Sequence, residues 1–423
     1  MRPRIYVIAF ALAAGCGASS DGASDAGAPP NTDDGGGADV NYVGDDDDAS
    51  DANVVEEAPP DVSTNPTLPS VLLTAIGTGG MPPAFATVFQ NGAWTPLTMI
   101  GDNESGSSGG GVTPLANNQA LAVLGSVAGA AVSSTWAGTW PTLYQIDTAA
   151  DTFVSAPVAV SPGAFVAEES SVGTYPITLD TFDEGAPSWS TGEMTGAVGD
   201  ARCIPVVAVT GAGDPVVLFA STPSGVSSYR WVARTTGTWN AVANVPGVAT
   251  FAGAAGLPAA AAVTRTGLDQ IVAVFLTGGP TVFALQSSTL SAGAWSTTPL
   301  VVATDVVTAG YGTPFSLTAL PDGRVALAYA TASSAIQVGF FDGSAWGTFS
   351  AVPSAVPTGT FAPLSITHGI GGDVLELAFI DQNYFIRHAR LTSESSDSAW
   401  TWTTPVVVDS SQSYSFVSIA SSP

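Results

Sequence analysis

One short string in the chain has the spacing of a catalytic nucleophile: GSSGG, from Gly106 to Gly110, matches the pattern G-x-S-x-G. In hydrolases with this pattern, the serine lies on a sharp turn between a strand and a helix, which exposes its hydroxyl. No helical spacing of apolar residues follows Gly110. The serine is therefore expected in a Gly/Ser-rich loop between two structural units.

Histidine is the side chain that most often transfers protons or binds zinc, and the chain has only His368 and His388. A Ser-His-Asp site is recognised by geometry rather than by residue order, so the sequence leaves it open. His388 lies in NYFIRHARL, which suits a polar strand surface, and His368 precedes Gly369 in an expected turn. Neither histidine has another ligand residue at the sequence spacing of a zinc site, so we predict no metal. We also assign no catalytic residue and no cofactor.

Charge narrows the function classes further. The net charge is −26, and all nine basic residues are arginine. Nucleic acids and anionic lipid head groups bind clustered cations, so neither is expected as a partner. A Walker-type phosphate loop and a Schiff-base enzyme both need lysine, which this sequence lacks.

The elements that must position any site are strands, because apolar residues alternate with a period of two from about Leu68 onward. In VALAYAT, Val325 and Leu327 point to one face and the alanines to the other, so this strand is expected to be covered on both sides. Similar runs begin near residues 71, 120, 215, 271, 325 and 374. The interval from 120 to 215 is about twice as long as the others, and the weaker run SVGTYPITLD lies where the missing copy is expected. The period is about 50 residues.

An aromatic residue, which we call the Trp mark, recurs with the same period. A Trp after a small or turn-forming residue recurs at Trp94, Trp189, Trp239, Trp295, Trp346 and Trp400, with Phe153 taking this place in the second unit. A period of 40 to 50 residues with several short strands is typical of a propeller blade. We expect each Trp to open the outer strand of its blade and to cover the neighbouring blade.

The predicted fold is therefore an all-β, seven-bladed β-propeller over residues 67–423. Six blades are the alternative, because the stretch 161–200 is short for a unit. The first unit begins with its second strand, and SYSFVSIAS near the end has the pattern of an inner strand. That segment is expected to close the ring, since closure leaves no exposed inner edge. A loose terminal strand is the alternative.

Three tryptophans are candidate ligand-binding residues. Trp136 and Trp140 lie in SSTWAGTWP, an insertion in the second unit, and Trp402 lies beside Trp400. Aromatic rings among hydroxyl side chains suit sugars, which have an apolar face edged with hydroxyls. Packing against an adjacent blade is the alternative for all three rings.

The first residues have the layout of a secretory signal, with Arg2 and Arg4 before an apolar stretch from Ile5 to Ala14. LAAGC, from Leu12 to Cys16, resembles the bacterial lipobox. The resemblance implies a signal peptide over 1–15, a lipid on Cys16 and an outer-membrane lipoprotein of the cell envelope. A plain cleaved signal with an incidental cysteine is the alternative. With Cys16 acylated, Cys203 has no disulfide partner and is expected to be a buried thiol.

Residues 16–66 are predicted to be a disordered acidic tether. They are rich in Gly, Ala, Ser and Pro, carry thirteen acidic side chains and contain almost no large apolar ones. Such a segment buries too little apolar surface to offset its conformational entropy. Asp45 to Asp48 are adjacent, whereas calcium loops space their carboxylates around a turn.

Two turn regions resemble the Asp-box of sialidase and BNR-type propellers, Ser/Thr-x-Asp-x-Gly-x-x-Trp. TFDEGAPSW contains Thr181, Asp183 and Gly185 with the Trp one residue late, and FDGSAW contains a related pattern. Sialidases also need three arginines, a tyrosine nucleophile and an acidic partner. Only Arg202, in RCIP, resembles part of that set.

Three functions remain open. The leading hypothesis is a monomeric, lipid-anchored and noncatalytic propeller that binds a glycan or a protein. The second is a glycan-acting hydrolase or lyase of sialidase-like fold, and the third is a structural envelope component. Paired carboxylates about 5 to 10 Å apart at the channel mouth would favour the enzyme.

Overall fold

The computed structural model describes residues 70–422, except for gaps at 80–81, 103–108, 117, 126–130, 142–143, 147–151, 171–173, 191, 200–203, 222–227, 250–259, 279–282, 308–313, 359–362, 371–373 and 394–399. All of these residues belong to the compact unit Ser63–Pro423. The predicted lipidation site Cys16, the tether, Arg202 and Cys203 lie outside the described residues. Within the described ranges, no helix is long and apolar enough to cross a membrane.

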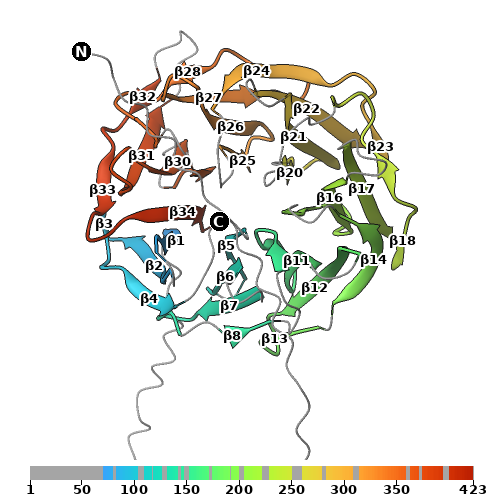
Figure 1. The fold of residues 1–423 in the computed structure, drawn as a ribbon, viewed down its shortest axis with the longest axis horizontal. Coiled ribbons are helices and arrows are strands. Elements are labelled where there is room, and N and C mark those ends of the chain that lie inside the picture. The colour runs from blue at the N-terminus through green and yellow to red at the C-terminus, as the bar shows by residue number, and fades with distance from the viewer. Residues whose placement is uncertain are drawn as a thin grey trace, which may run out of the picture. The chain divides into compact units, whose positions relative to one another are not determined.

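The strands form seven antiparallel sheets that fan around an axis (Figure 1). The prediction of a seven-bladed propeller is confirmed, and the six-bladed alternative is wrong. Blades are numbered here in the chain order of their second strands. The innermost strands of blades 1 to 7 are β34 (Tyr414–Ser421), β5 (Gly110–Pro114), β9 (Thr152–Val154) with β10 (Val158–Val160), β15 (Val206–Val209), β20 (Ala260–Thr264), β25 (Phe315–Ala319) and β29 (Leu364–His368).

The second strands form the middle of each blade, and the third strands lie outside them. The second strands are β1 (Val71–Gly77), β6 (Ala120–Gly125), β11 (Gly163–Ser170), β16 (Pro215–Ser221), β21 (Gln270–Gly278), β26 (Val325–Ala330) and β30 (Leu375–Ile380). The third strands are β2 (Ala84–Gln90), β7 (Ala131–Trp136), β12 (Pro176–Asp183), β17 (Ser228–Thr235), β22 (Phe283–Ser291), β27 (Ile336–Phe341) and β31 (Ile386–Ser393).

The outermost strands are short and often split in two. They are β3 (Ala93–Trp94), β4 (Thr98–Gly101), β8 (Tyr144–Gln145), β13 (Ser188–Trp189), β14 (Glu193–Val198), β18 (Thr238–Trp239), β19 (Ala243–Asn244), β23 (Ala294–Trp295), β24 (Leu300–Val306), β28 (Ser350–Ala351), β32 (Thr401–Trp402) and β33 (Val406–Asp409).

The ring is closed by the last strand of the chain. β34 pairs antiparallel with β1, from Val71 opposite Ser421 to Ile76 opposite Phe416. Figure 1 shows β34, in red, beside β1, in blue. The predicted closure is confirmed, and the loose terminal strand is excluded.

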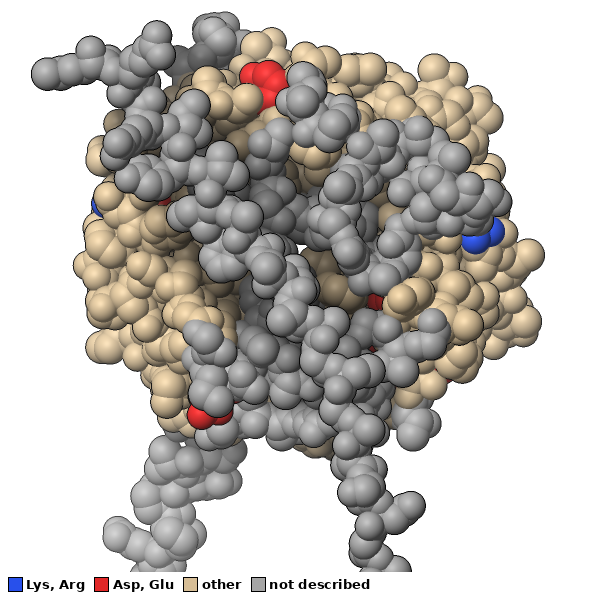
Figure 2. Space-filling model, viewed as in Figure 1, with Lys and Arg blue, Asp and Glu red and all other residues tan. Residues whose placement is uncertain are grey.

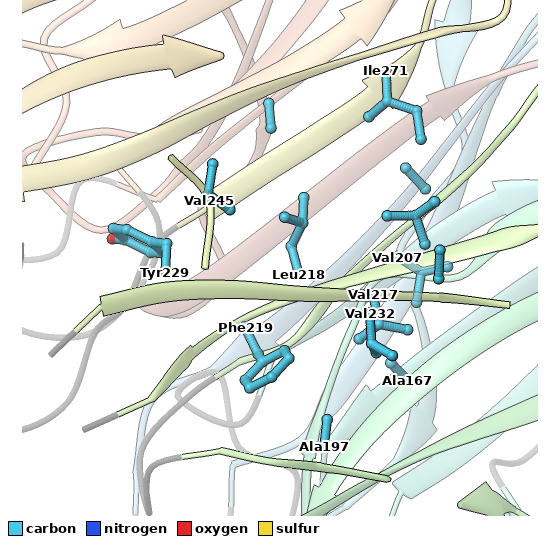
Figure 3. Close-up of a cluster of buried hydrophobic side chains, with 14 of the residues drawn as sticks. Ala167, Ala197, Val207, Val217, Leu218, Phe219, Tyr229, Val232, Val245 and Ile271 are labelled. Atoms are coloured by element: carbon cyan, nitrogen blue, oxygen red, sulfur yellow. The ribbon is translucent and has the colours of Figure 1, made fainter. Parts of the chain in front are cut away.

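The core lies between neighbouring blades, because most residues on both faces of the second strands are apolar. Every residue of β26 and of β30 is buried. Figure 3 shows Leu218 and Phe219 projecting from opposite faces of β16, with Phe219 directed toward Ala197 of blade 3. One blade alone would expose apolar residues on both of its faces, so the blades stabilise one another.

The Trp mark opens the outer strand, as expected, but two of its assignments are wrong. In blade 7, Trp402 pairs with Leu391 in this position, whereas Trp400 packs on Phe340 of blade 6 with ring centroids 4.9 Å apart. Phe153 lies in β9, where it pairs with Glu169 of blade 3. The second blade instead has a tryptophan, Trp140, after the turn that follows β7.

Candidate functional site

The seven innermost strands surround one cavity of about 300 Å³, which we call the axial cavity. Figure 2 shows a hollow near the centre of the propeller face. Each blade contributes to the lining of the axial cavity, through Ser418, Gly110, Ala156, Val206, Ala261, Ser316 and Ser365 for blades 1 to 7.

Hydroxyl groups supply much of the side-chain polarity of this cavity. Ser316 Oγ accepts a hydrogen bond of 3.2 Å from the backbone N–H of Ile366 in the next blade. Ser365 Oγ accepts from Ile419, at 3.1 Å, and Ser418 Oγ accepts from Val112, at 3.3 Å. Each serine thereby occupies an N–H on the open edge of the neighbouring inner strand, and no residue in the described ranges accepts a hydrogen bond from its own O–H.

The described lining of the axial cavity contains no titratable side chain. No group of three His, Cys, Asp or Glu side chains that could hold a metal occurs in the described ranges either. The cavity can therefore bind a ligand through apolar contact and hydroxyl hydrogen bonds. Its described lining offers no pair of carboxylates for acid and base catalysis.

A second hollow, which we call the blade 6/7 pocket, lies where the connection from blade 6 crosses the turn between β30 and β31. It has a volume of about 270 Å³, and Val356, Phe379, Asp381, Asn383, Arg387 and Thr404 contribute to its lining. Arg387 Nε donates to Asp381 Oδ2 over 2.8 Å. This pocket therefore combines a charge pair with apolar walls.

The three predicted ligand-binding tryptophans pack against clusters of buried residues that two neighbouring blades share. Trp136 is 5% exposed and packs with Leu72 of blade 1, and Trp140 packs against the same cluster. Trp402 packs against the cluster of blades 6 and 7 that contains Leu377. The structure does not bring Trp402 together with the other two, which lie in blade 2. Ligand binding by these residues stays a prediction.

The two histidines have different surroundings. His368 ends β29, and its imidazole lies 3.0 Å from Ser421 Oγ of the closing strand. Burial lowers the pKa of His368 below its usual value, which favours the neutral form. No carboxylate is hydrogen-bonded to this imidazole among the contacts of the described residues, so they form no Ser-His-Asp site.

The expected position of His388 on a polar strand surface is wrong. His388 is 2% exposed and hydrogen-bonds through Nε2 to Glu376 Oε2 over 2.7 Å. Its ring also meets the edge of Trp94, with centroids 5.1 Å apart, at the contact between blades 7 and 1. A partner on the adjacent strand makes burial of this polar ring possible.

The two regions that resemble the Asp-box are both turns between a third and an outer strand. Asp183 Oδ1 accepts from the N–H of Gly185, and Asp342 Oδ1 accepts from the N–H groups of Ser344 and Ala345. These backbone donors lower the pKa of Asp342 to about 2. Both aspartates therefore stabilise turns.

Comparison with known proteins shows the fold alone. No protein-family model and no curated sequence matches the chain. AofleA from Arthrobotrys oligospora has a similar structure, with a TM-score of 0.50 and 12% identity over 74% of this chain and 89% of that protein. The fucose-specific lectin from Aleuria aurantia matches with a TM-score of 0.48 and 13% identity, over 70% of this chain and 95% of the lectin. The NanB sialidase from Streptococcus pneumoniae matches with a TM-score of 0.40 and 11% identity, over 71% of this chain and 61% of the sialidase.

Sequence reasoning missed the serines and the Asp381–Arg387 pair. The serines do leave a signal, because FSLTA, LSITH and VSIAS repeat a Ser-apolar pair at intervals close to the blade period. Asp381 and Arg387 match no motif. Only an alignment of TASSAIQ with DQNYFIR, the same segment in blades 6 and 7, marks them as unusual.

Proposed function

We propose that this protein is a monomeric, lipid-anchored propeller of the cell envelope that binds a glycan or a protein without catalysis. The observation that supports binding is the chemical nature of the residues that line the axial cavity. The axial cavity offers hydroxyls and apolar groups, and its described lining has no acid or base. Propeller faces and channel mouths commonly serve as binding platforms, although a fold by itself does not define a ligand.

The anchor part of the proposal rests on LAAGC and the acidic segment that follows it. A lipid on Cys16 would hold the chain in the outer membrane, and residues 16–66 would let the propeller reach away from it. Expression of the full chain in a Gram-negative host with a labelled fatty acid tests this. The label should appear on the natural chain and disappear in Cys16→Ala, and an unlabelled natural chain would exclude the anchor.

A glycan array probed with the full chain in detergent tests the binding part. We expect selective retention of a small group of glycans, weakened by Trp140→Ala and Trp402→Ala if those rings bind sugar. Because both rings also pack between blades, the Tm of each variant must be measured alongside. Turnover of a labelled polysaccharide would instead support the glycan-acting hydrolase or lyase.

A further inference from the structure

The turn between the second and third strands has the same backbone in blades 6 and 7. In blade 7, the N–H of Asp381 donates to Phe385 O and the N–H of Tyr384 donates to Asp381 O. In blade 6, Thr331, Ala335 and Ser334 form the same two bonds. Tyr384 and Ser334 both have positive φ, at 64° and 59°. The two blades therefore provide an internal comparison of side chains on one backbone.

The turn itself does not require charge. Thr331 Oγ1 in blade 6 accepts the N–H of Ala335 at 3.1 Å, as Asp381 Oδ1 in blade 7 accepts the N–H of Phe385 at 3.0 Å. A hydroxyl thus performs this role in one blade and a carboxylate in the other. Gln337 occupies the place of Arg387, since each lies six residues after the first residue of its turn. The charge pair of blade 7 is an addition to a turn that forms without it.

This added pair faces the blade 6/7 pocket in an ordered arrangement. Asp381 is fixed by the N–H groups of Asn383 and Phe385 and by Arg387 Nε. The Arg387 side chain is 26% exposed, and no described residue accepts a hydrogen bond from its Nη1 or Nη2. The guanidinium therefore presents preoriented donors to the pocket. Beside it, three of the four acceptor positions of the Asp381 carboxylate are used, and one on Oδ2 is left to accept.

We infer that the blade 6/7 pocket binds a neutral sugar ring, with Arg387 donating to one hydroxyl and Asp381 accepting from its neighbour. This inference rests on the proposed function, because it names the sugar site of a glycan-binding propeller. The volume of about 270 Å³ is close to the lower end of ligand pockets, roughly 300 Å³. Val356, 41% exposed, and Pro405 supply the apolar contact for the C–H face of the ring.

Charge favours a neutral ligand over an acidic one. Asp381 already neutralises Arg387 at 2.8 Å, so a ligand carboxylate would meet a pair with no net charge. The chain as a whole carries −26, which repels anions at long range. A vicinal diol, in contrast, matches one donor group beside one acceptor group.

The test uses the full chain labelled with ¹⁵N at arginine, because only nine arginines contribute signals. The Arg387 Nε–H signal is assigned by its loss in Arg387→Gln, which installs the side chain that blade 6 has. Titration with methyl glycosides of mannose, galactose, glucose and N-acetylglucosamine should move this signal saturably for at least one sugar. N-acetylneuraminic acid should not move it.

Affinity for the responding sugar should fall at least tenfold in Arg387→Gln and in Asp381→Thr. Thr404→Trp fills the pocket without altering the turn, and it should have the same effect if either of the first two variants fails to fold. Arg324→Gln is the matched control, because Arg324 forms the same Nε-to-Asp contact of 2.8 Å with Asp322 at an exposed turn. Its affinity should stay within twofold of the natural chain.

The outcomes separate this inference from the proposed function. If the chain binds glycans on the array while the Arg387 signal and the Arg387→Gln affinity stay unchanged, the pocket assignment is overturned and the proposed function stands. If neither the neutral sugars nor any glycan on the array binds, the pocket assignment and the glycan part of the proposed function are both overturned. A response to N-acetylneuraminic acid alone would overturn the choice of a neutral ligand.

Discussion

The inner strands meet in two different ways around the axis. From blade 6 through blades 7 and 1 to blade 2, a serine hydroxyl at each junction accepts an N–H from the next strand: Ser316, Ser365 and Ser418. The opposite arc runs from blade 2 through blades 3, 4 and 5 to blade 6. There the second residue of β5 is Gly111 and that of β20 is Ala261, and neither has a polar side chain. We call these the serine arc and the apolar arc.

The serine arc spans the place where the ring closes. β34 is joined to its blade by hydrogen bonds rather than by a short covalent connection, so noncovalent contacts must set its register. The serine bonds fix that register on both sides, through Ser365 to Ile419 and through Val112 to Ser418. Packing of the blades at the axis requires a small residue at each of these junctions. A small residue with a hydroxyl, serine, occurs where the register of β34 must be fixed.

Removal of β34, by ending the chain after Ser413, should destabilise the serine arc more than any other change. Tyr414, Val417 and Ile419 would leave the cluster that contains Val71 and Leu73. Burial of one large apolar side chain stabilises by roughly 1.5 to 3 kcal/mol, so three of them approach a total stability of about 5 to 15 kcal/mol. We expect no cooperative thermal transition by circular dichroism.

A synthetic peptide of residues 412–423 serves as the control for this truncation. Added in excess, it should restore the transition because it can occupy the vacant edge of β1. A truncated chain that melts in one step near the natural Tm would contradict the closing role of β34.

Gly111→Ala tests whether small size is essential where the two arcs join. A Cβ at Gly111 would lie 2.8 Å from Ala156 Cβ and 3.2 Å from Ser418 Oγ, which is closer than these atoms can approach without movement. We expect a loss of about 1 to 3 kcal/mol in urea unfolding. The double variant Gly111→Ala with Ala156→Gly should recover part of the loss, and a single variant as stable as the natural chain would show that the junction has spare room.

Ser365→Ala separates the hydroxyl from its size. The substitution leaves the N–H of Ile419 without its acceptor and should cost about 1 kcal/mol. The matched control is Ala261→Ser, which adds a hydroxyl to the apolar arc and should change stability by less than about 0.5 kcal/mol. Equal effects of the two changes in urea unfolding would remove the distinction between the arcs.

Much of this architecture could be predicted from the sequence, because second strands buried on both faces leave a continuous apolar run in each unit. The alternation around Val325 and Leu327 thus located a blade directly. The outer strands were harder, since they are short and their Trp follows turns of unequal length. That is why Trp400 was assigned the position of Trp402, and Phe153 that of Trp140.

The candidate sites were less predictable, because they depend on contacts between strands and blades. Asp381 and Arg387 meet only since a tight turn returns β31 alongside β30. His388 was expected at the surface because its neighbours in sequence are polar, whereas its partner Glu376 lies on the adjacent strand. Local sequence does not contain this information.

The pH dependence of stability should give the smallest effect, at the edge of the serine arc. The pKa of His368 is lowered mainly by burial, so the unfolded chain, with a usual His pKa of about 6.5, binds a proton more readily than the folded one. Stability contributed by neutral His368 is present above about pH 7 and is lost as pH falls through 6.5 toward the folded-state pKa. His368→Gln removes this proton uptake, so the decrease in Tm between pH 7 and pH 5 should be smaller in the variant. Carboxylates that titrate over the same range contribute equally to both chains, and parallel Tm curves would show that His368 is not perturbed by its position beside Ser421.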